Sequence, residues 1–83
     1  MHLDQLPRLQ PATIAAVDWA RLGGTDAKRL RDLGFDEGVA VEVLHHGPVG
    51  RDPMAVRLGR MTVAIRRAHA RAFLVAPEMA EAA

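Results

Sequence analysis

Residues 54–65 read MAVRLGRMTVAI, and this stretch decides the fold. In each half, apolar residues alternate with polar or small ones, which is the period of a half-buried β-strand. The Gly59–Arg60 pair between the halves suits a tight two-residue turn. The stretch therefore predicts a β-hairpin. The residues of its first strand that are expected to face inward are Met54, Val56 and Leu58.

Further strands are expected on both sides of this hairpin. Residues 39–45 carry valine at every second position at their start, so they predict another strand with one apolar face. A loop is expected at residues 47–53, GPVGRDP, because glycine and proline break regular structure. β-Branched residues indicate a weaker strand at 12–19, and a last short strand is expected at 72–75, before Pro77.

One helix is predicted between the glycine pair at 23–24 and the glycine at position 34. Thr25 or Asp26 can cap the free N–H groups at its start. Gly34 suits the left-handed position that ends a helix, and Phe35 then folds back on Leu30. Only about two turns are present, so the helix must pack against a sheet to be stable.

Five short strands and one short helix predict a mainly β fold, a small and partly open SH3-like barrel. Residues 1–10 are expected to form a turn or short helical lead-in, and residues 66–70 a single helical turn. The chain of 83 residues is long enough for one core only. We expect one domain over residues 1–83, with its core at about 6–75 and a frayed tail at 76–83.

Composition and charge exclude several classes of function. The 11 Lys and Arg residues are offset by 10 Asp and Glu residues, so we expect no nucleic-acid partner. No apolar run approaches the ~18 residues of a membrane span, and residues 1–10 do not resemble a signal peptide. We therefore expect a cytoplasmic protein that does not insert into a membrane.

Catalytic chemistry is not expected either. The chain has no cysteine, which excludes disulfides, zinc ribbons and thiol nucleophiles. It has no serine, and its three threonines fall in predicted strands or at a helix cap. The glycine-rich stretch at 47–50 lacks the Gly-Lys-Ser/Thr that holds nucleotide phosphates. The sequence therefore predicts a protein that is not an enzyme.

Three stretches in order carry a resemblance to a known family. They are RLRDLGFDEG at 29–38 followed by VEV at 41–43, GPVGRDPMAVR at 47–57, and AIRR at 64–67 followed by Ala70. Together they resemble the FeoA family, and the match runs from about residue 6 to residue 75. Glu37 stands where the family has proline, and Arg51 is an extra residue within the family's Gly-Asp-Pro loop.

The resemblance implies a small cytosolic accessory protein of bacterial ferrous iron uptake. Such a protein acts on the membrane transporter FeoB by binding its cytoplasmic GTP-binding domain. We expect no required cofactor. The same domain also occurs at the C-terminus of DtxR-type repressors. Because 83 residues leave no room for a helix-turn-helix module, we expect a free-standing copy.

Exposed arginines are the first candidates for contacts with a partner. Arg57 points away from the apolar face of the hairpin, and Arg66 and Arg67 follow its second strand, so the three could form one basic patch for acidic groups. The alternative is a solvated face of the barrel. Arg66 matches the arginine of the family's Ala-Leu-Arg motif. Trp19, the single tryptophan, is a candidate interface anchor, with core packing as the alternative.

Histidines make a metal-binding module the competing hypothesis. Imidazole is the softest ligand in the chain for a divalent transition metal such as iron or zinc. His45 and His46 are neighbours on a predicted strand and point to opposite faces, so one of them at most joins His69 or a carboxylate such as Asp52 or Glu42. The alternatives are solvated side chains, or a site shared between two copies in a metal-bridged homo-oligomer.

Overall fold

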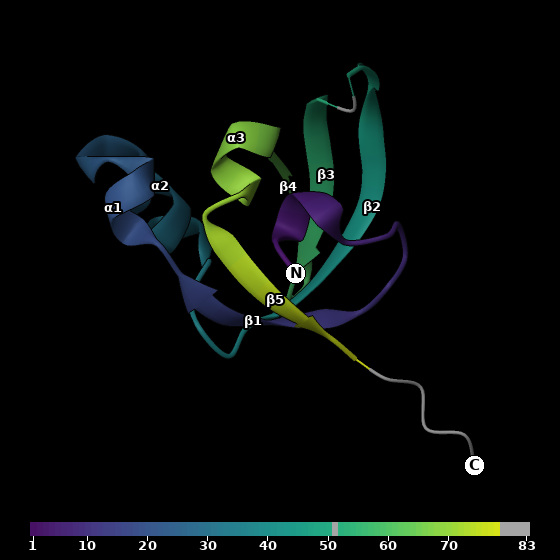
Figure 1. The fold of residues 1–83 in the computed structure, drawn as a ribbon, viewed down its shortest axis with the longest axis horizontal. Helices are drawn as coiled ribbons and strands as arrows, with labels where there is room; N and C mark the ends of the chain where they lie inside the picture. The colour runs from purple at the N-terminus through teal and green to yellow at the C-terminus, as the bar shows by residue number, and fades with distance from the viewer. Residues whose placement is uncertain (51, 79–83) are drawn as a thin grey trace.

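The computed structural model describes residues 1–50 and 52–78 (Figure 1). Its elements are, in order, η1 (Leu3–Gln5), β1 (Ala12–Val17), α1 (Trp19–Leu22), α2 (Gly24–Leu33), β2 (Ala40–Val49), β3 (Asp52–Leu58), β4 (Met61–Ile65), α3 (Arg67–Ala70) and β5 (Phe73–Pro77). The strands form one antiparallel sheet in the order β4-β3-β2-β1-β5. Within the described residues β4 and β5 do not pair, so the sheet stays open. The prediction of a mainly β, partly open barrel is confirmed.

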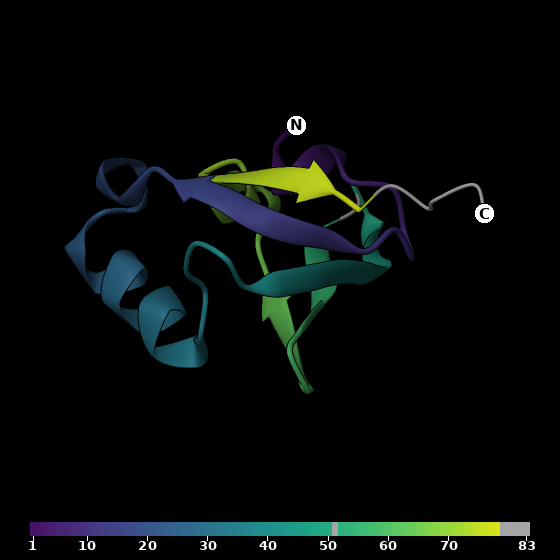
Figure 2. The same cartoon turned by 90° about the horizontal axis from the view of Figure 1, so that it is seen from below.

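The core lies between the two halves of this sheet. Figure 2 shows β1 and β5 in one layer that crosses the β3–β4 hairpin. The residues buried between them are all apolar. The largest side chains that are fully buried belong to Phe35, Phe73, Leu3, Leu6, Ile14, Leu30, Met54, Val43 and Val56. In the part of the chain described, no polar or charged residue belongs to the buried set, so the packing of the core is apolar.

The hairpin that decides the fold forms as expected. Met54, Val56 and Leu58 are buried, and β4 keeps an unbroken register with β3. Gly59 has a φ of 61°, which is the left-handed conformation that a two-residue turn with glycine in first place requires. The alternation of apolar residues was therefore a sufficient signal for this pair of strands.

A β-bulge at Leu44 was not predicted. Val43 lies opposite Val56, but the register shifts by one residue before His45, which lies opposite Ala55. His46 consequently lies opposite the buried Met54 and shares its face of the sheet. The bulge thus turns the second histidine of the pair toward the interior and the first toward the exterior.

The loop expected at residues 47–53 is much shorter than predicted. β2 continues to Val49 and β3 begins at Asp52, so most of this stretch extends the two strands. The expectation was wrong because the proline at position 53 is the second residue of β3 and does not break the strand. Arg51, the extra residue of the family's loop, lies outside the described residues.

α2 ends as predicted but begins at Gly24, earlier than a cap at Thr25 or Asp26 would allow. Gly34 has a φ of 114°, and the Phe35 N–H donates to the Leu30 carbonyl at 3.1 Å, which is the expected C-terminal cap. At the other end the cap position is Gly23, and no side chain caps the helix. Thr25 and Asp26 are therefore the second and third residues of the helix and not its cap.

α1 was not predicted, and its first residue, Trp19, was assigned to the first strand. β1 ends at Val17, and Asp18 then caps α1 by accepting a hydrogen bond from the Arg21 N–H at 3.3 Å. A single helical turn leaves no periodic pattern in the sequence. Among the residues described, none of the helices has the length and apolar character that a membrane crossing needs.

β5 runs further than the predicted strand at 72–75. It begins at Phe73 and includes Pro77, so two residues of the expected tail belong to the sheet. Glu78 follows the strand, and its N–H donates to the Pro11 carbonyl at 2.8 Å, whereas positions 79–83 lie outside the described residues. The outer edge of β5 is covered by the start of the chain, because the Val75 N–H donates to the Met1 carbonyl at 2.8 Å and His2 bridges to Leu74. One edge of the sheet is therefore closed.

Candidate functional site

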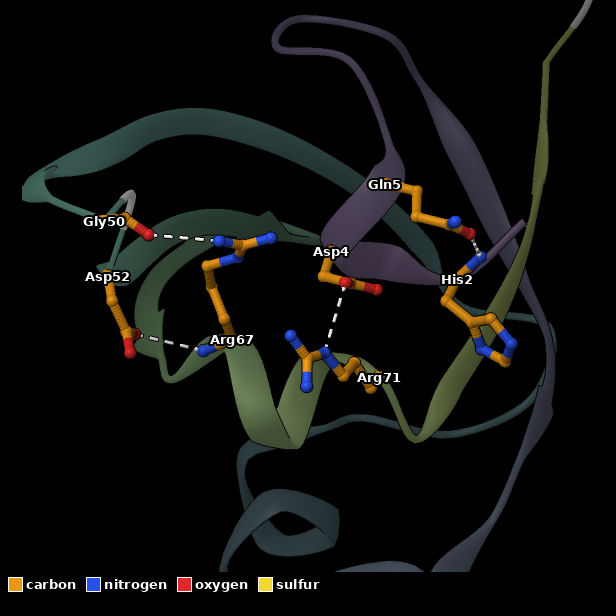
Figure 3. A network of polar contacts seen from close by, with 7 residues as sticks. All are labelled: His2, Asp4, Gln5, Gly50, Asp52, Arg67 and Arg71. Atoms are coloured by element: carbon orange, nitrogen blue, oxygen red, sulfur yellow. Dashed lines mark hydrogen bonds and ion pairs between the residues drawn. The ribbon is translucent and has the colours of Figure 1, made fainter.

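Two of the predicted site residues, Asp52 and Arg67, contact each other. One carboxylate oxygen of Asp52 accepts a hydrogen bond from the Arg67 N–H at 3.0 Å, at the start of α3 (Figure 3). The Arg67 guanidinium turns back and donates to the Gly50 carbonyl at 3.1 Å. These bonds fasten α3 to the turn between β2 and β3. Arg67 was predicted to face a partner and Asp52 to bind a metal, and both make structural contacts here.

Arg66 lies at the surface, at the junction of β4 and α3. It is exposed, and no hydrogen bond or ion pair of its side chain is found in the described residues. It lines a cleft of about 420 Å³ together with Arg29, Asp52, Pro53 and Ala64. Two arginines, one from α2 and one from the junction of β4 and α3, thus line the same cleft.

Arg29 adds positive charge to this cleft that the sequence did not reveal. Its guanidinium lies 3.9 Å from an Asp26 carboxylate oxygen, at the limit of an ion pair, and 56% of its side chain is exposed. Exposed pairs of this kind contribute little and break readily. We name Arg29 and Arg66 the arginine pair. Both side chains are cationic, and guanidinium groups bind carboxylates through charge-assisted hydrogen bonds.

Arg57 does not join the arginine pair. It lies opposite Thr62 on β4, so Arg66 is four residues, or about 13 Å, further along the sheet. Its guanidinium lies 3.7 Å from the carboxylate of Glu42, its cross-strand neighbour on β2. The three arginines expected to form one patch are therefore distributed over three different environments.

Trp19 packs against the core. Its ring meets Phe73 edge to face, with ring centroids 6.3 Å apart and an interplanar angle of 84°. The Arg31 guanidinium carbon lies over the Trp19 ring, 4.3 Å from its centroid, within the range of a cation–π contact. Trp19 therefore connects α1 to β5 and α2, which is the alternative that sequence analysis left open.

The histidines are divided between two places. His69 on α3 contacts Asp26 on α2, with 3.2 Å between the imidazole Nε2 and a carboxylate oxygen, and 22% of its side chain is exposed. His45 and His46 instead line a cleft of about 540 Å³ with residues 4–8. Over residues 1–50 and 52–78, no group of three or more His, Asp or Glu side chains is arranged to hold a metal ion.

A contact between η1 and α3 was missed by sequence analysis. An Asp4 carboxylate oxygen lies 3.5 Å from the Arg71 Nε, and only 10% of the Asp4 side chain is exposed (Figure 3). The two residues are far apart in the chain, and no local pattern links them. Only the folded arrangement of η1 beside α3 could reveal the pair.

Comparison with known proteins gives the same family in sequence and in structure. A family model described as the FeoA domain matches residues 1–77. FeoA from Stenotrophomonas maltophilia, solved with zinc, is 36% identical with a TM-score of 0.75, over 92% of this chain and 89% of that one. That protein is described as an SH3-domain protein proposed to be an activating factor of ferrous iron transport.

Two other solved structures are also similar. FeoA from Chlorobium tepidum is 28% identical with a TM-score of 0.79, over 98% of this chain and 73% of that one. Iron(II) transport protein A from Clostridium thermocellum is 25% identical with a TM-score of 0.79, over 90% of this chain and 44% of that one. The comparison with curated protein sequences gave no match. The SH3-like fold predicted from the sequence is confirmed.

Proposed function

Because the chain belongs to the FeoA family, which is associated with ferrous iron transport, we propose that it is an accessory protein of bacterial ferrous iron uptake. In this proposal it is not an enzyme. It acts in the cytoplasm by binding the GTP-binding domain of the transporter FeoB. The observation that carries the proposal is the match of the FeoA domain over residues 1–77.

The arginine pair supports binding to a protein partner. Arg66 is exposed, and the Arg29 guanidinium lies 3.9 Å from the carboxylate of Asp26. Both side chains can therefore turn toward a partner's carboxylate with little loss of free energy. Their cleft is bordered by Pro53 and Ala64, which offer no competing charge. Asp52 lies at the same cleft, but one of its oxygens is engaged by the Arg67 N–H. We therefore expect the partner to place acidic side chains here.

Titration calorimetry with the GTP-binding domain of FeoB from the same organism tests the proposal. The wild-type protein is expected to bind, and Arg66→Glu is expected to weaken binding at least tenfold, because it puts a carboxylate where the partner's carboxylate would lie. Arg8→Glu is the matched control, since Arg8 is exposed and does not line the cleft that contains the arginine pair. Absence of wild-type binding at high micromolar concentration would contradict the proposed function.

Metal binding between two copies is the second candidate function. The zinc in the FeoA of S. maltophilia favours it. His45 and His46 line one cleft and His69 lies elsewhere, so one chain brings too few ligands together for the four that zinc prefers. A second chain could supply the remaining ligands.

Sedimentation with and without zinc tests this second function. Zinc is expected to produce a dimer of the wild-type protein. A variant with glutamine at His45, His46 and His69 is expected to stay monomeric, because amide groups are poor zinc ligands. A triple variant that still dimerises with zinc would contradict a histidine-based site.

A further inference from the structure

The two edges of the sheet differ. The edge of β5 is covered by Met1 and His2, whereas β4 ends the sheet on the other side. Leu58 and Met61 flank the two-residue turn, so their backbones are hydrogen-bonded to each other. Along β4, every second residue from Met61 onward is hydrogen-bonded to β3 in the same way. Thr62 and Ala64 therefore direct their N–H and C=O groups away from β3. No backbone bond joins them to another segment in the described parts of the chain.

The usual protections of an edge strand are absent from β4. Natural edges carry lysine, proline, an inward charge or a bulge that prevents pairing with a further strand. β4 reads MTVAI, without a charged residue or proline, and its register with β3 has no bulge. Thr62 and Ala64 are exposed, and 46% of Met61 is exposed. The edge therefore has exposed backbone groups and no charged residue, proline or bulge within β4 that would prevent a further strand from pairing.

Positive charge at both ends of β4 defines the strand that would fit. Arg60 precedes the strand and Arg66 follows it, both are exposed, and Arg29 adds a second guanidinium at the Arg66 end. Residues 60, 62, 64 and 66 share one face by strand periodicity. A fitting partner strand therefore carries an acidic side chain opposite each end.

A second copy of β4 fits poorly. If two copies paired antiparallel over their full length, Arg60 of one copy would lie opposite Arg66 of the other. Like charges in directly opposed positions destabilise a strand pair. The charge pattern thus selects against self-association and for an acidic partner.

We propose that the edge of β4 binds an extended segment of a partner protein as a sixth strand, and that this segment carries acidic residues six positions apart. The backbone of Thr62 and Ala64 supplies the hydrogen bonds, and Arg60 and the arginine pair bind the two acidic side chains. The inference deepens the proposed function by naming how the partner binds, but its chemistry can be tested without that partner.

The first test is a nuclear magnetic resonance titration with a blocked peptide, Glu-Val-Thr-Val-Thr-Val-Glu. Its two acidic residues lie opposite Arg66 and Arg60 when it pairs antiparallel with residues 60–66. The amides of Thr62 and Ala64 are expected to shift. The same peptide with lysine at both ends is expected to bind roughly tenfold more weakly, because both ends then repel an arginine. Equal affinity for the two peptides, or unshifted amides at Thr62 and Ala64, would overturn the proposal.

A proline variant isolates the backbone contribution. Ala64→Pro removes an N–H that points away from β3, so the hairpin is expected to stay folded while peptide binding is lost. Ala64→Thr changes the side chain and keeps the N–H, so its affinity measures the side-chain contribution at this position, and the proline variant is expected to bind more weakly than the threonine variant. A proline variant that binds as tightly as the threonine variant contradicts strand addition. Self-association of the unliganded protein through Thr62 and Ala64 would also overturn it.

Hydrogen exchange in the complex with the FeoB domain separates this proposal from the proposed function. Slower exchange at Thr62 and Ala64 in the complex is the expected result. If the domain binds and these two amides exchange as fast as in the free protein, the edge proposal is wrong and the proposed function stands. If the domain does not bind but the acidic peptide binds at β4, the proposed function is wrong and the edge proposal stands.

Discussion

Gly34 shows how much one residue determines at the end of α2. Its φ of 114° is open to glycine and strained for other residues, and it lets Phe35 reach back to bond with Leu30. Both of those side chains are fully buried. The conformation of one exposed glycine therefore places two core residues.

Replacing Gly34 with alanine is expected to destabilise the protein by about 1–2 kcal/mol, the cost of a left-handed conformation for a residue with a Cβ. The added Cβ would also lie 3.4 Å from a Leu58 methyl group. Urea unfolding of the variant measures this loss. Gly24→Ala is the control, because Gly24 is helical and a Cβ there meets nothing within 4 Å. An equal loss in the two variants would contradict the role of the left-handed conformation.

Asp52 provides a second prediction at this scale. Asp52→Ala removes the acceptor of the Arg67 N–H and is expected to cost about 1 kcal/mol in the free energy of unfolding. Asp52→Asn keeps an oxygen at that position, so most of the stability is expected to remain. If denaturant midpoints show the asparagine variant to be as unstable as the alanine variant, the hydrogen bond is not what stabilises this junction.

At the scale of elements, the helix and strands that could be predicted were those with a periodic pattern of apolar residues in the sequence. The hairpin at 54–65 and the helix before Gly34 have strong local patterns, and both form as expected. The bulge at Leu44 and the single turn of α1 have none, because each depends on how neighbouring segments pack. The bulge matters most for the candidate site, since it decides which histidine of the pair faces inward.

Trp19 anchors α1, and its replacement tests whether that packing is structural. Trp19→Ala is expected to lower the free energy of unfolding by about 2–3 kcal/mol, somewhat below the ~3–5 kcal/mol of a fully buried tryptophan. It removes the contacts with Phe73 and the Arg31 guanidinium. Trp19→Phe retains an aromatic ring and is expected to lose less. Thermal unfolding that leaves the alanine variant unchanged would favour an interface role for Trp19.

For the whole molecule, the contacts that join distant elements were beyond prediction from the sequence. His69 with Asp26, and Asp4 with Arg71, each join two elements through residues far apart in the chain. Arginines and histidines were named as candidates for their chemistry, and that choice stays a prediction. Their grouping was not predictable, because Arg57, Arg66 and Arg67 reach different surroundings only after the sheet has bent.

Amide hydrogen exchange over the whole free protein provides a test of the open sheet. Thr62 and Ala64 are expected to exchange rapidly, because their N–H groups face solvent at the edge of β4. Val75 is expected to exchange slowly, since its N–H bonds to Met1 at the opposite edge. Slow exchange at Thr62 and Ala64 in a monomer would mean that another segment covers β4.

The cover that Met1 and His2 place over β5 has a consequence for stoichiometry. A sheet with two open edges can add chains on both sides without limit, which is how strand pairing leads to fibres. With one edge covered, each copy of this chain has a single edge left for pairing, so it cannot join two partner strands through opposite edges. A partner that enters at β4 would therefore form a complex of one to one and could not link further copies into a polymer.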